Sequence, residues 1–120
     1  MAVRALRGAT QLEADVREHL LDRVAELVRE VLGRNGLAVD DVISIVLTAT
    51  PDLHSEFPAY AARAAGVTGV PLLCAQEMEV AGAMPRVVRL LAHVETSLRR
   101  DEVRHVYLHG ARELRTDLPR

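Results

Sequence analysis

The sequence predicts an α/β or α+β fold in which a single mixed β-sheet packs against helices. Short apolar runs typical of strands alternate with amphipathic helical patterns along most of the chain. Hydrophobic residues make up 49% and charged residues 27%, which is a globular balance. The length of 120 residues suits one core, so we expect residues 1–120 to form a single domain, with 111–120 as a C-terminal tail.

The N-terminal region is expected to contain a strand and a long helix. Residues 2–8 are short and mostly apolar, which predicts a strand. Thr10 and Glu13 have the spacing of a capping box, and they precede apolar residues that recur at three- and four-residue intervals over 16–31. These features predict an amphipathic helix that ends near Asn35-Gly36.

The middle of the chain is expected to contain two strands and a short helix. Residues 42–49 form a continuous β-branched run, which predicts a strand covered on both faces. Ser55 is positioned to cap a short helix over about 57–65. The apolar run 70–74 predicts another strand.

A further helix is expected after GAMP (82–85), because a proline suits the first helical turn, and it should end at 93–96. Helical spacing would place Arg86, Arg89 and His93 on one flank. From the pattern alone this flank is a solvated basic face, because the charged flanks of amphipathic helices ordinarily lie in water.

The last strand is expected at 105–108. His105 and His109 have the HxxxH spacing of a helical metal site, but four residues of a strand span about 13 Å. Two histidines that far apart cannot share a metal ion. The spacing therefore predicts no metal site here.

Composition excludes several classes of function. The net charge of −2 provides no overall basic surface for nucleic acid, and no segment is long and apolar enough to cross a membrane. All 15 basic residues are arginine, so arginine alone signals little. One cysteine cannot form an internal disulfide, and a reducing compartment fits best. We expect a cytoplasmic protein.

The segment CAQEME (74–79) is a candidate site, because it follows a predicted strand and precedes a predicted helix. Cys74 could be a nucleophile, but without a local signature a buried, inert thiol is favoured. Glu77 could be an acid, a base or a hydrogen-bond acceptor, and spacing does not decide between these roles or simple solvation. No glycine motif for phosphates or dinucleotides is present.

Several segments resemble, in order, the motifs of the α/β-type chorismate mutases. They are RGAT (7–10), ATPDLHSEFPAYAAR (49–63), CAQEMEV (74–80), Arg89 and RHVYLHGARELRTDL (104–118). The resemblance implies a trimer-forming domain with active sites at the interfaces of a homotrimer. It also implies conversion of chorismate to prephenate, on the route to phenylalanine and tyrosine, with no metal or organic cofactor.

The resemblance also implies the roles of individual residues. Arg89 would donate hydrogen bonds to the ether oxygen and a carboxylate of the substrate, where charge develops. Arg7 and Tyr107 would hold the side-chain carboxylate, and Cys74 and Glu77 would contact the ring hydroxyl. The remaining residues expected near the substrate are Phe57, Ala59, Tyr60, Arg63, Leu72, Leu73, Leu114 and Arg115.

Three positions depart from the family pattern. Tyr60 stands where the family carries lysine, Leu73 replaces a hydroxyl residue, and Thr116 replaces proline. Two alternatives are weighed beside the enzyme: a sensor that binds chorismate or prephenate without turnover, and another small trimeric enzyme such as an enamine or imine hydrolase. Neither alternative predicts CAQEMEV together with Arg89 and RHVYL.

Overall fold

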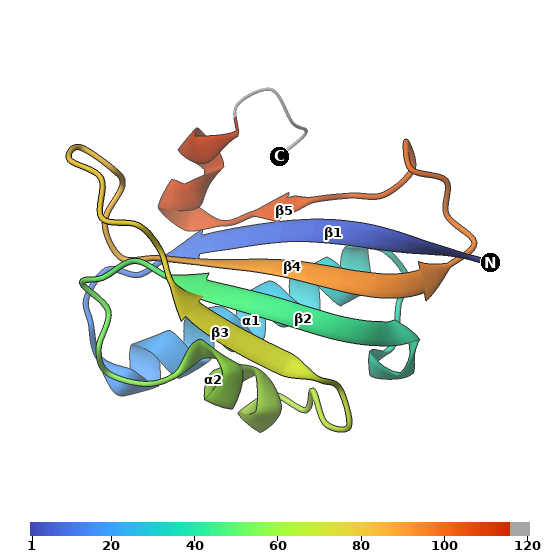
Figure 1. The fold of residues 1–120 in the computed structure, drawn as a ribbon, viewed down its shortest axis with the longest axis horizontal. Helices are drawn as coiled ribbons and strands as arrows, with labels where there is room; N and C mark the ends of the chain where they lie inside the picture. Colours follow the sequence, from blue (N-terminus) through green and yellow to red (C-terminus); the bar gives the residue numbers. More distant parts are fainter. Residues whose placement is uncertain (116–120) are drawn as a thin grey trace.

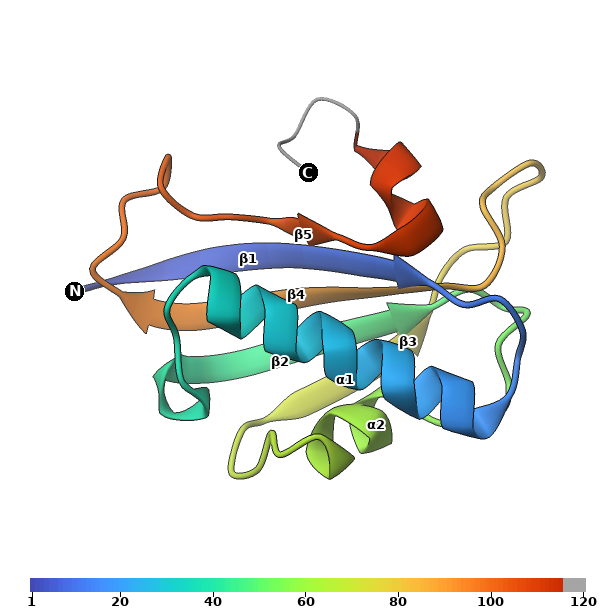
Figure 2. The ribbon, with the colours of Figure 1, turned by 180° about the vertical axis from the view of Figure 1, so that it is seen from behind.

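The computed structural model describes residues 1–115, in which a five-stranded mixed sheet carries two α-helices on one side (Figures 1 and 2). The strands are β1 (Ala2–Gln11), β2 (Val42–Ala49), β3 (Leu72–Gln76), β4 (Val87–Thr96) and β5 (Val106–Tyr107). The helices are α1 (Arg17–Arg34) and α2 (Pro58–Ala64), with short 3-10 turns η1 (Val39–Asp41) and η2 (His109–Leu114). Among the described residues, no helix is long and apolar enough to span a membrane.

The strand order is β3-β2-β4-β1-β5, so β4 lies at the centre. It runs antiparallel to β1, from the pair Gln11 and Val87 to the pair Ala2 and Thr96, and antiparallel to β2 on its other side. The edge strands are parallel to their neighbours, β3 to β2 and β5 to β1. This confirms the predicted mixed sheet with helices packed on it.

Helix α1 forms much of the core with the apolar stripe that the sequence predicts. Leu20, Val24, Leu27, Val28 and Val31 are buried against the sheet. The helix approaches β1 closely at Gly8, where an added Cβ would lie 3.0 Å from Val31 and 3.2 Å from Leu27. Gly8 therefore sets the distance between the long helix and the sheet.

The helix expected over 82–96 is wrong, because this segment forms β4. Val87, Val88, Leu91 and Val94 fit a helical stripe, but the residues from 88 to 95 also alternate strictly. Val88, Leu90, Ala92 and Val94 are buried, whereas the residues between them face the other side. Arg89 and His93 therefore share a face through the two-residue period of a strand, and Arg86 precedes the strand in a turn with φ 54°.

The predicted helix caps are also wrong. Thr10 lies within β1 because the pairing with β4 continues to Gln11, and its buried hydroxyl has no hydrogen-bond partner in residues 1–115. Helix α1 starts later, after Val16, without a side-chain cap. Ser55 does not cap α2, which follows Phe57 and begins at a proline.

Both helices cover the same side of the sheet, so the prediction that β2 is covered on both faces is wrong for the single chain. We call the uncovered side the open face; Figure 1 looks onto it, and Figure 2 looks onto the helices. Several apolar side chains of the open face are exposed, including Val3 (58%), Leu73 (64%) and Leu91 (37%). An exposed apolar sheet face on a small chain is typical of a surface that contacts another protein molecule.

Candidate active site

An ion pair between Glu77 and Arg89 lies on the open face. Arg89 donates from Nε to Oε2 of Glu77 at 3.0 Å, and the hydroxyl of Thr48 donates to the same oxygen at 2.6 Å. The Glu77 side chain is 18% exposed, but that of Arg89 is 43% exposed. The carboxylate is thus held by two donors, while the guanidinium keeps a face toward solvent.

The register of the sheet explains this contact. Arg89 on β4 pairs with Thr48 on β2, and the backbone N–H of Glu77, just past the end of β3, donates to Ala49 at 2.9 Å. The loop after β3 therefore returns Glu77 over the neighbouring strands. A carboxylate twelve residues from Arg89 in the sequence reaches its guanidinium in this way.

Two more predicted residues join the pair from the other half of the sheet. Ala9 on β1 pairs with Arg89 on one side and with Tyr107 of β5 on the other. Arg7 lies two residues before Ala9 and points to the same side, because alternate residues of a strand share a face. We call Arg7, Glu77, Arg89 and Tyr107 the open-face group.

Other predicted residues lie on the helix side, and we call them the α2 group. They are Phe57, Ala59, Tyr60, Arg63, Leu72 and Cys74. Phe57 and Cys74 line a cavity of about 430 Å³ between β3 and the segment before α2. Cys74 is a half-buried free thiol that packs against the core, which agrees with an inert role. A single chain thus divides the predicted residues between two sides of the sheet.

Three predicted residues belong to neither group. Leu73 is on the open face of β3, next to Val46 of β2. Leu114 is the last residue of η2 and is half-buried, as is Arg115. The departure at Thr116 lies outside the described residues.

Tyr60, which stands where the resemblance implies a lysine, has a cation beside it. The guanidinium carbon of Arg17 lies 5.4 Å from the centre of the Tyr60 ring, within the range of a cation–π interaction. Nε of Arg17 also donates to Glu56 at 2.9 Å. The backbone N–H of Phe57 and the guanidinium of Arg17 lower the pKa of Glu56, so this carboxylate stays charged beside the ring.

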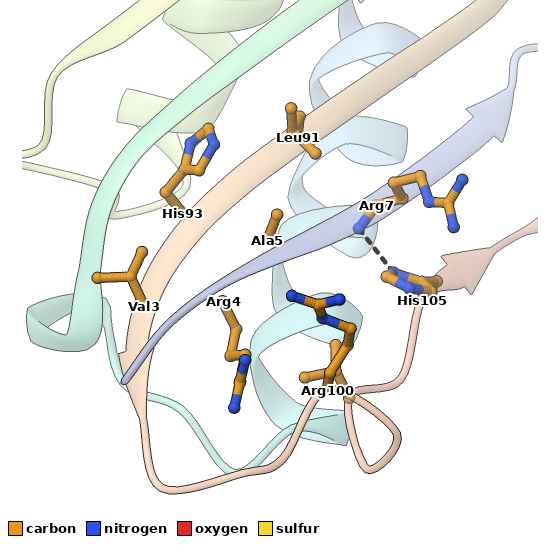
Figure 3. Close-up of a pocket in the computed structure, with 9 residues that line it drawn as sticks. Val3, Arg4, Ala5, Arg7, Leu91, His93, Arg100 and His105 are labelled. Atoms are coloured by element: carbon orange, nitrogen blue, oxygen red, sulfur yellow. Dashed lines mark hydrogen bonds between the residues drawn. The ribbon is translucent and has the colours of Figure 1, made fainter. Parts of the chain in front are cut away.

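A second cavity, of about 520 Å³, opens beside Arg7 toward the far end of β4 (Figure 3). It is lined by Val3, Arg4, Ala5, Arg7, Leu91, His93, Arg100, Val103 and His105, with no acidic side chain among them. Arg4, Arg100, His93 and His105 are not among the site residues that the sequence predicts. The two-residue period of β4 would have placed His93 on the face of Arg89.

His105 accepts a hydrogen bond at Nδ1 from the backbone N–H of Arg7, at 2.9 Å. Burial lowers the pKa of His105, and the charges of Arg7 and Arg115 lower it further. The ring is therefore neutral at pH 7, with Nδ1 free to accept. This contact ties the chain before β5 to the strand that carries Arg7.

The arrangement combines permanent cations with one bound carboxylate. Within residues 1–115, no three His, Cys, Asp or Glu side chains are close enough to hold a metal ion. In the same residues, neither Glu77 nor Cys74 has a hydrogen bond to a histidine that would activate it. The fold and the site thus define a small α+β protein suited to an anionic ligand.

Comparison with known proteins identifies the family. The family model for chorismate mutase type I matches residues 3–118, and the chain belongs to this family. The AroH chorismate mutase of Bacillus subtilis is 40% identical over 119 residues, which cover 98% of this chain and 94% of that protein. The AroH chorismate mutase of Thermus thermophilus is 44% identical over 117 residues, covering 97% and 96%.

A solved structure supports the same assignment. The chorismate mutase from Clostridium thermocellum superposes with a TM-score of 0.89 at 38% sequence identity, covering 92% of this chain and 98% of that one. The fold, with its strand β4 where the sequence pattern predicts a helix, is therefore the fold of a chorismate mutase.

Proposed function

We propose that this chain converts chorismate to prephenate and that Arg89 supplies the main electrostatic stabilisation. In this rearrangement a carbon–oxygen bond breaks while a carbon–carbon bond forms, and negative charge grows on the ether oxygen. A fixed guanidinium beside that oxygen stabilises the transition state more than the ground state. The observation that carries this proposal is the Arg89–Glu77 pair on the open face.

The geometry of Arg89 suits this role. Its Nε is bound to Glu77, and within residues 1–115 neither terminal nitrogen donates to another protein group. These nitrogens can therefore donate to the ether oxygen and to a carboxylate. Because Glu77 already orients the guanidinium, little reorganisation is needed when charge develops.

The proposed role of Glu77, together with Cys74, is to orient the substrate through its ring hydroxyl. Glu77 accepts from Thr48 and Arg89 with one oxygen, Oε2. Oε1 has no donor within residues 1–115, so it can accept a substrate hydroxyl. No proton transfer or covalent bond to the protein is required.

Arg7 and Tyr107 are proposed to bind the side-chain carboxylate. They lie on β1 and β5, which pair directly, and both face the same side as Arg89. Two guanidinium groups complement a dianion, and such pairs form strong, directional hydrogen bonds. Holding both carboxylates would favour the folded conformer in which the reacting carbons meet.

The site is proposed to be completed between subunits of a homotrimer. The α2 group and the open-face group lie on opposite sides of the sheet at β3. The two groups of one chain therefore cannot contact the same substrate molecule. Phe57 is 68% exposed, Tyr60 is 41% exposed and Arg63 is also exposed, so these residues are available to a neighbouring copy. Leu114 and Arg115 would then line the mouth. The exposed leucines of the open face give the subunits an apolar contact.

The proposed compartment is the cytoplasm, and the proposed pathway is the synthesis of phenylalanine and tyrosine. A single domain that spans residues 1–120 would carry out the reaction. The single free thiol of Cys74 suits a reducing compartment.

An ultraviolet assay of chorismate disappearance, with and without a chelator, tests the activity. We expect prephenate to form at the same rate in both. Calorimetric binding of chorismate without turnover would indicate a sensor instead. Hydrolysis of an imino acid in place of chorismate loss would indicate a hydrolase.

A further inference from the structure

The side chain of Gln11 joins two segments that are far apart in the sequence. Gln11 is the last residue of β1, and its Nε2 donates to the carbonyl of Pro85 at 3.0 Å, at the end of the loop 77–86. On its other side the carboxamide lies against Gly110 in η2. One side chain thus contacts both the loop that begins with Glu77 and the C-terminal turn.

Gly110 leaves room for this side chain. A Cβ at position 110 would overlap Oε1 of Gln11 and lie 2.8 Å from Cδ. The backbone of Gly110 is not left-handed, so an alanine there would be free of backbone strain. Position 110 therefore needs a glycine because the Gln11 side chain occupies the space of a Cβ, and not because of the backbone conformation of residue 110.

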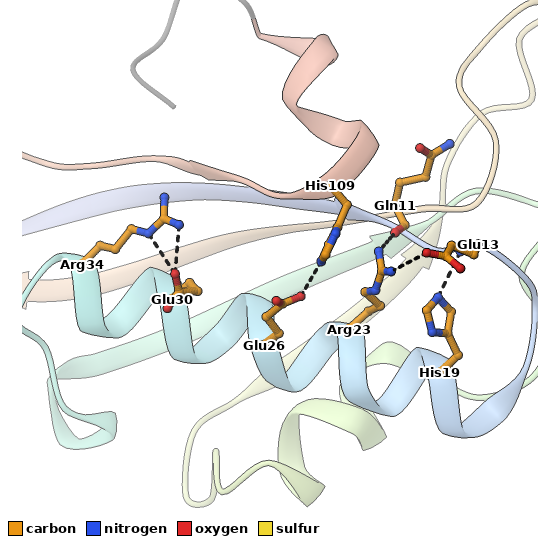
Figure 4. A network of polar contacts seen from close by, with 8 residues as sticks. All are labelled: Gln11, Glu13, His19, Arg23, Glu26, Glu30, Arg34 and His109. Carbon is orange, nitrogen blue, oxygen red and sulfur yellow. Dashed lines mark hydrogen bonds and ion pairs between the residues drawn. The ribbon is translucent and has the colours of Figure 1, made fainter.

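Polar side chains of α1 contact the backbone of Gln11 and the residue before Gly110 (Figure 4). Arg23 donates to the backbone carbonyl of Gln11 at 2.6 Å and also pairs with Glu13 at 3.2 Å. His109, the residue before Gly110, pairs with Glu26 at 2.7 Å. The backbone of Gln11 and the start of η2 are thus both attached to the same helix.

These segments border the open-face group at both sides. The loop 77–86 begins at Glu77 and leads into β4 two residues before Arg89, whereas η2 follows Tyr107 and ends at Leu114. We propose that Gln11 is a positioning residue that fixes the spacing between these two walls of the active site. This inference rests on the proposed chorismate mutase activity.

Steady-state kinetics of Gln11→Ala test the proposal. Glu77 keeps its contacts to Thr48, Ala49 and Arg89 in this variant, and the rest of the two segments is proposed to meet the substrate away from the developing charge. The loss should therefore be in binding that is equal in ground and transition states. We expect KM to rise about fivefold, the worth of one neutral hydrogen bond, with kcat within about twofold of wild type. An unchanged KM, or a fall in kcat with KM constant, would overturn the proposal.

A double-mutant cycle with Gly110→Ala makes the test specific to this contact. The added methyl should displace the carboxamide and raise KM to a similar extent. In the Gln11→Ala background the nearest atom of residue 11 is its Cβ, at 3.5 Å, which is an ordinary contact. Gly110→Ala should therefore cost almost nothing there. If the increase of KM in the double mutant equals the product of the two single increases, the two residues act independently. That result would refute the proposed contact between Gln11 and Gly110.

Gly33→Ala is the matched control, because nothing lies within 4 Å of an added Cβ in that helical position. It should leave KM unchanged, with Tm equal to or above that of wild type. Wild-type protein without chorismate turnover would refute the proposed function and this role together. If the wild type turns over chorismate but the two substitutions raise KM independently, only the role of Gln11 is refuted. The same double-mutant cycle can also be measured by Tm, which reports the contact between the two residues without any activity.

Discussion

Glu77 holds Arg89 through Nε, at 3.0 Å, and within residues 1–115 the two terminal nitrogens of the guanidinium donate to no protein group. Glu77 follows an edge strand, Arg89 lies on the central strand, and Thr48 on the strand between them supplies the second donor to the carboxylate. A carboxylate in this position orients a cation without neutralising the part that would meet the substrate. The relationship gives Glu77 and Arg89 separable roles.

Replacing Arg89 with alanine should lower kcat by about 100- to 1000-fold, because a preorganised donor to the developing charge is removed. The substituted residue is partly exposed, so Tm and the far-ultraviolet circular dichroism spectrum should change little. Arg29→Ala, on the exposed side of α1, is the control and should retain full activity. A rate near wild type for Arg89→Ala would exclude the proposed mechanism.

Glu77→Gln and Glu77→Ala should separate orientation from charge. Glutamine keeps an acceptor for Arg89, whereas alanine removes it, and a hydrogen bond to a charged group contributes about 1.5–3 kcal/mol. We expect kcat/KM to fall about tenfold or more in Glu77→Ala and less in Glu77→Gln. If Glu77 were a general base, glutamine would be as damaging as alanine.

Leu91→Arg should separate the subunits of the proposed homotrimer. Leu91 is 37% exposed on the open face and lines the cavity that also holds Arg4, Arg7 and Arg100, so a further positive charge there would be buried among cations on assembly. Sedimentation should detect the mass of one chain instead of three, with loss of chorismate turnover. Val16→Arg provides the comparison, since Val16 is 50% exposed outside the open face. A wild-type protein that sediments as a monomer with full activity would contradict a shared site.

His105 should make stability depend on pH. Because burial and the neighbouring arginines lower its pKa in the folded state, the unfolded chain takes up the proton first, near the ordinary value of 6.5. The free energy of unfolding should therefore be highest above pH 6.5 and fall as the pH drops below it. Denaturation of His105→Asn should show a shallower fall, whereas exposed His54→Asn should keep it. Equal slopes in all three proteins would mean that His105 is not the group responsible.

The sequence predicts β1, α1, β2, α2 and β3 to within a few residues because each shows one dominant pattern, either a helical period with its end signals or a short apolar run. The segment 87–96 satisfies two periods at once, and only pairing with β1 and β2 on either side decides that it is a strand. The same pairing extends β1 past Thr10 and removes the predicted cap. Local patterns cannot contain information about neighbours that are distant in the chain.

Apart from the segment CAQEME (74–79), which its position after a strand indicates, the residues of the candidate site are predicted only by the resemblance. Helical spacing grouped Arg89 with Arg86 as a solvated basic face, and the strand instead presents Arg89 beside Thr48. Glu77 is a predicted site residue, but no pattern in the sequence pairs it with Arg89, and it is the loop after β3 that places it 3.0 Å from the guanidinium. Thr48 was not named at all, because a threonine within an apolar strand carries no distinguishing pattern.

The central position of β4 has a consequence for folding. The first two long strands, β1 and β2, do not pair with each other, since both pair with β4. The β-sheet therefore cannot close until residues 87–96 have left the ribosome and found both partners. Contacts between such distant segments must be made against a large loss of chain entropy, which slows folding. Until then the apolar side of α1 has only an incomplete sheet to cover, and the nascent chain depends on its last third to become a folded protein.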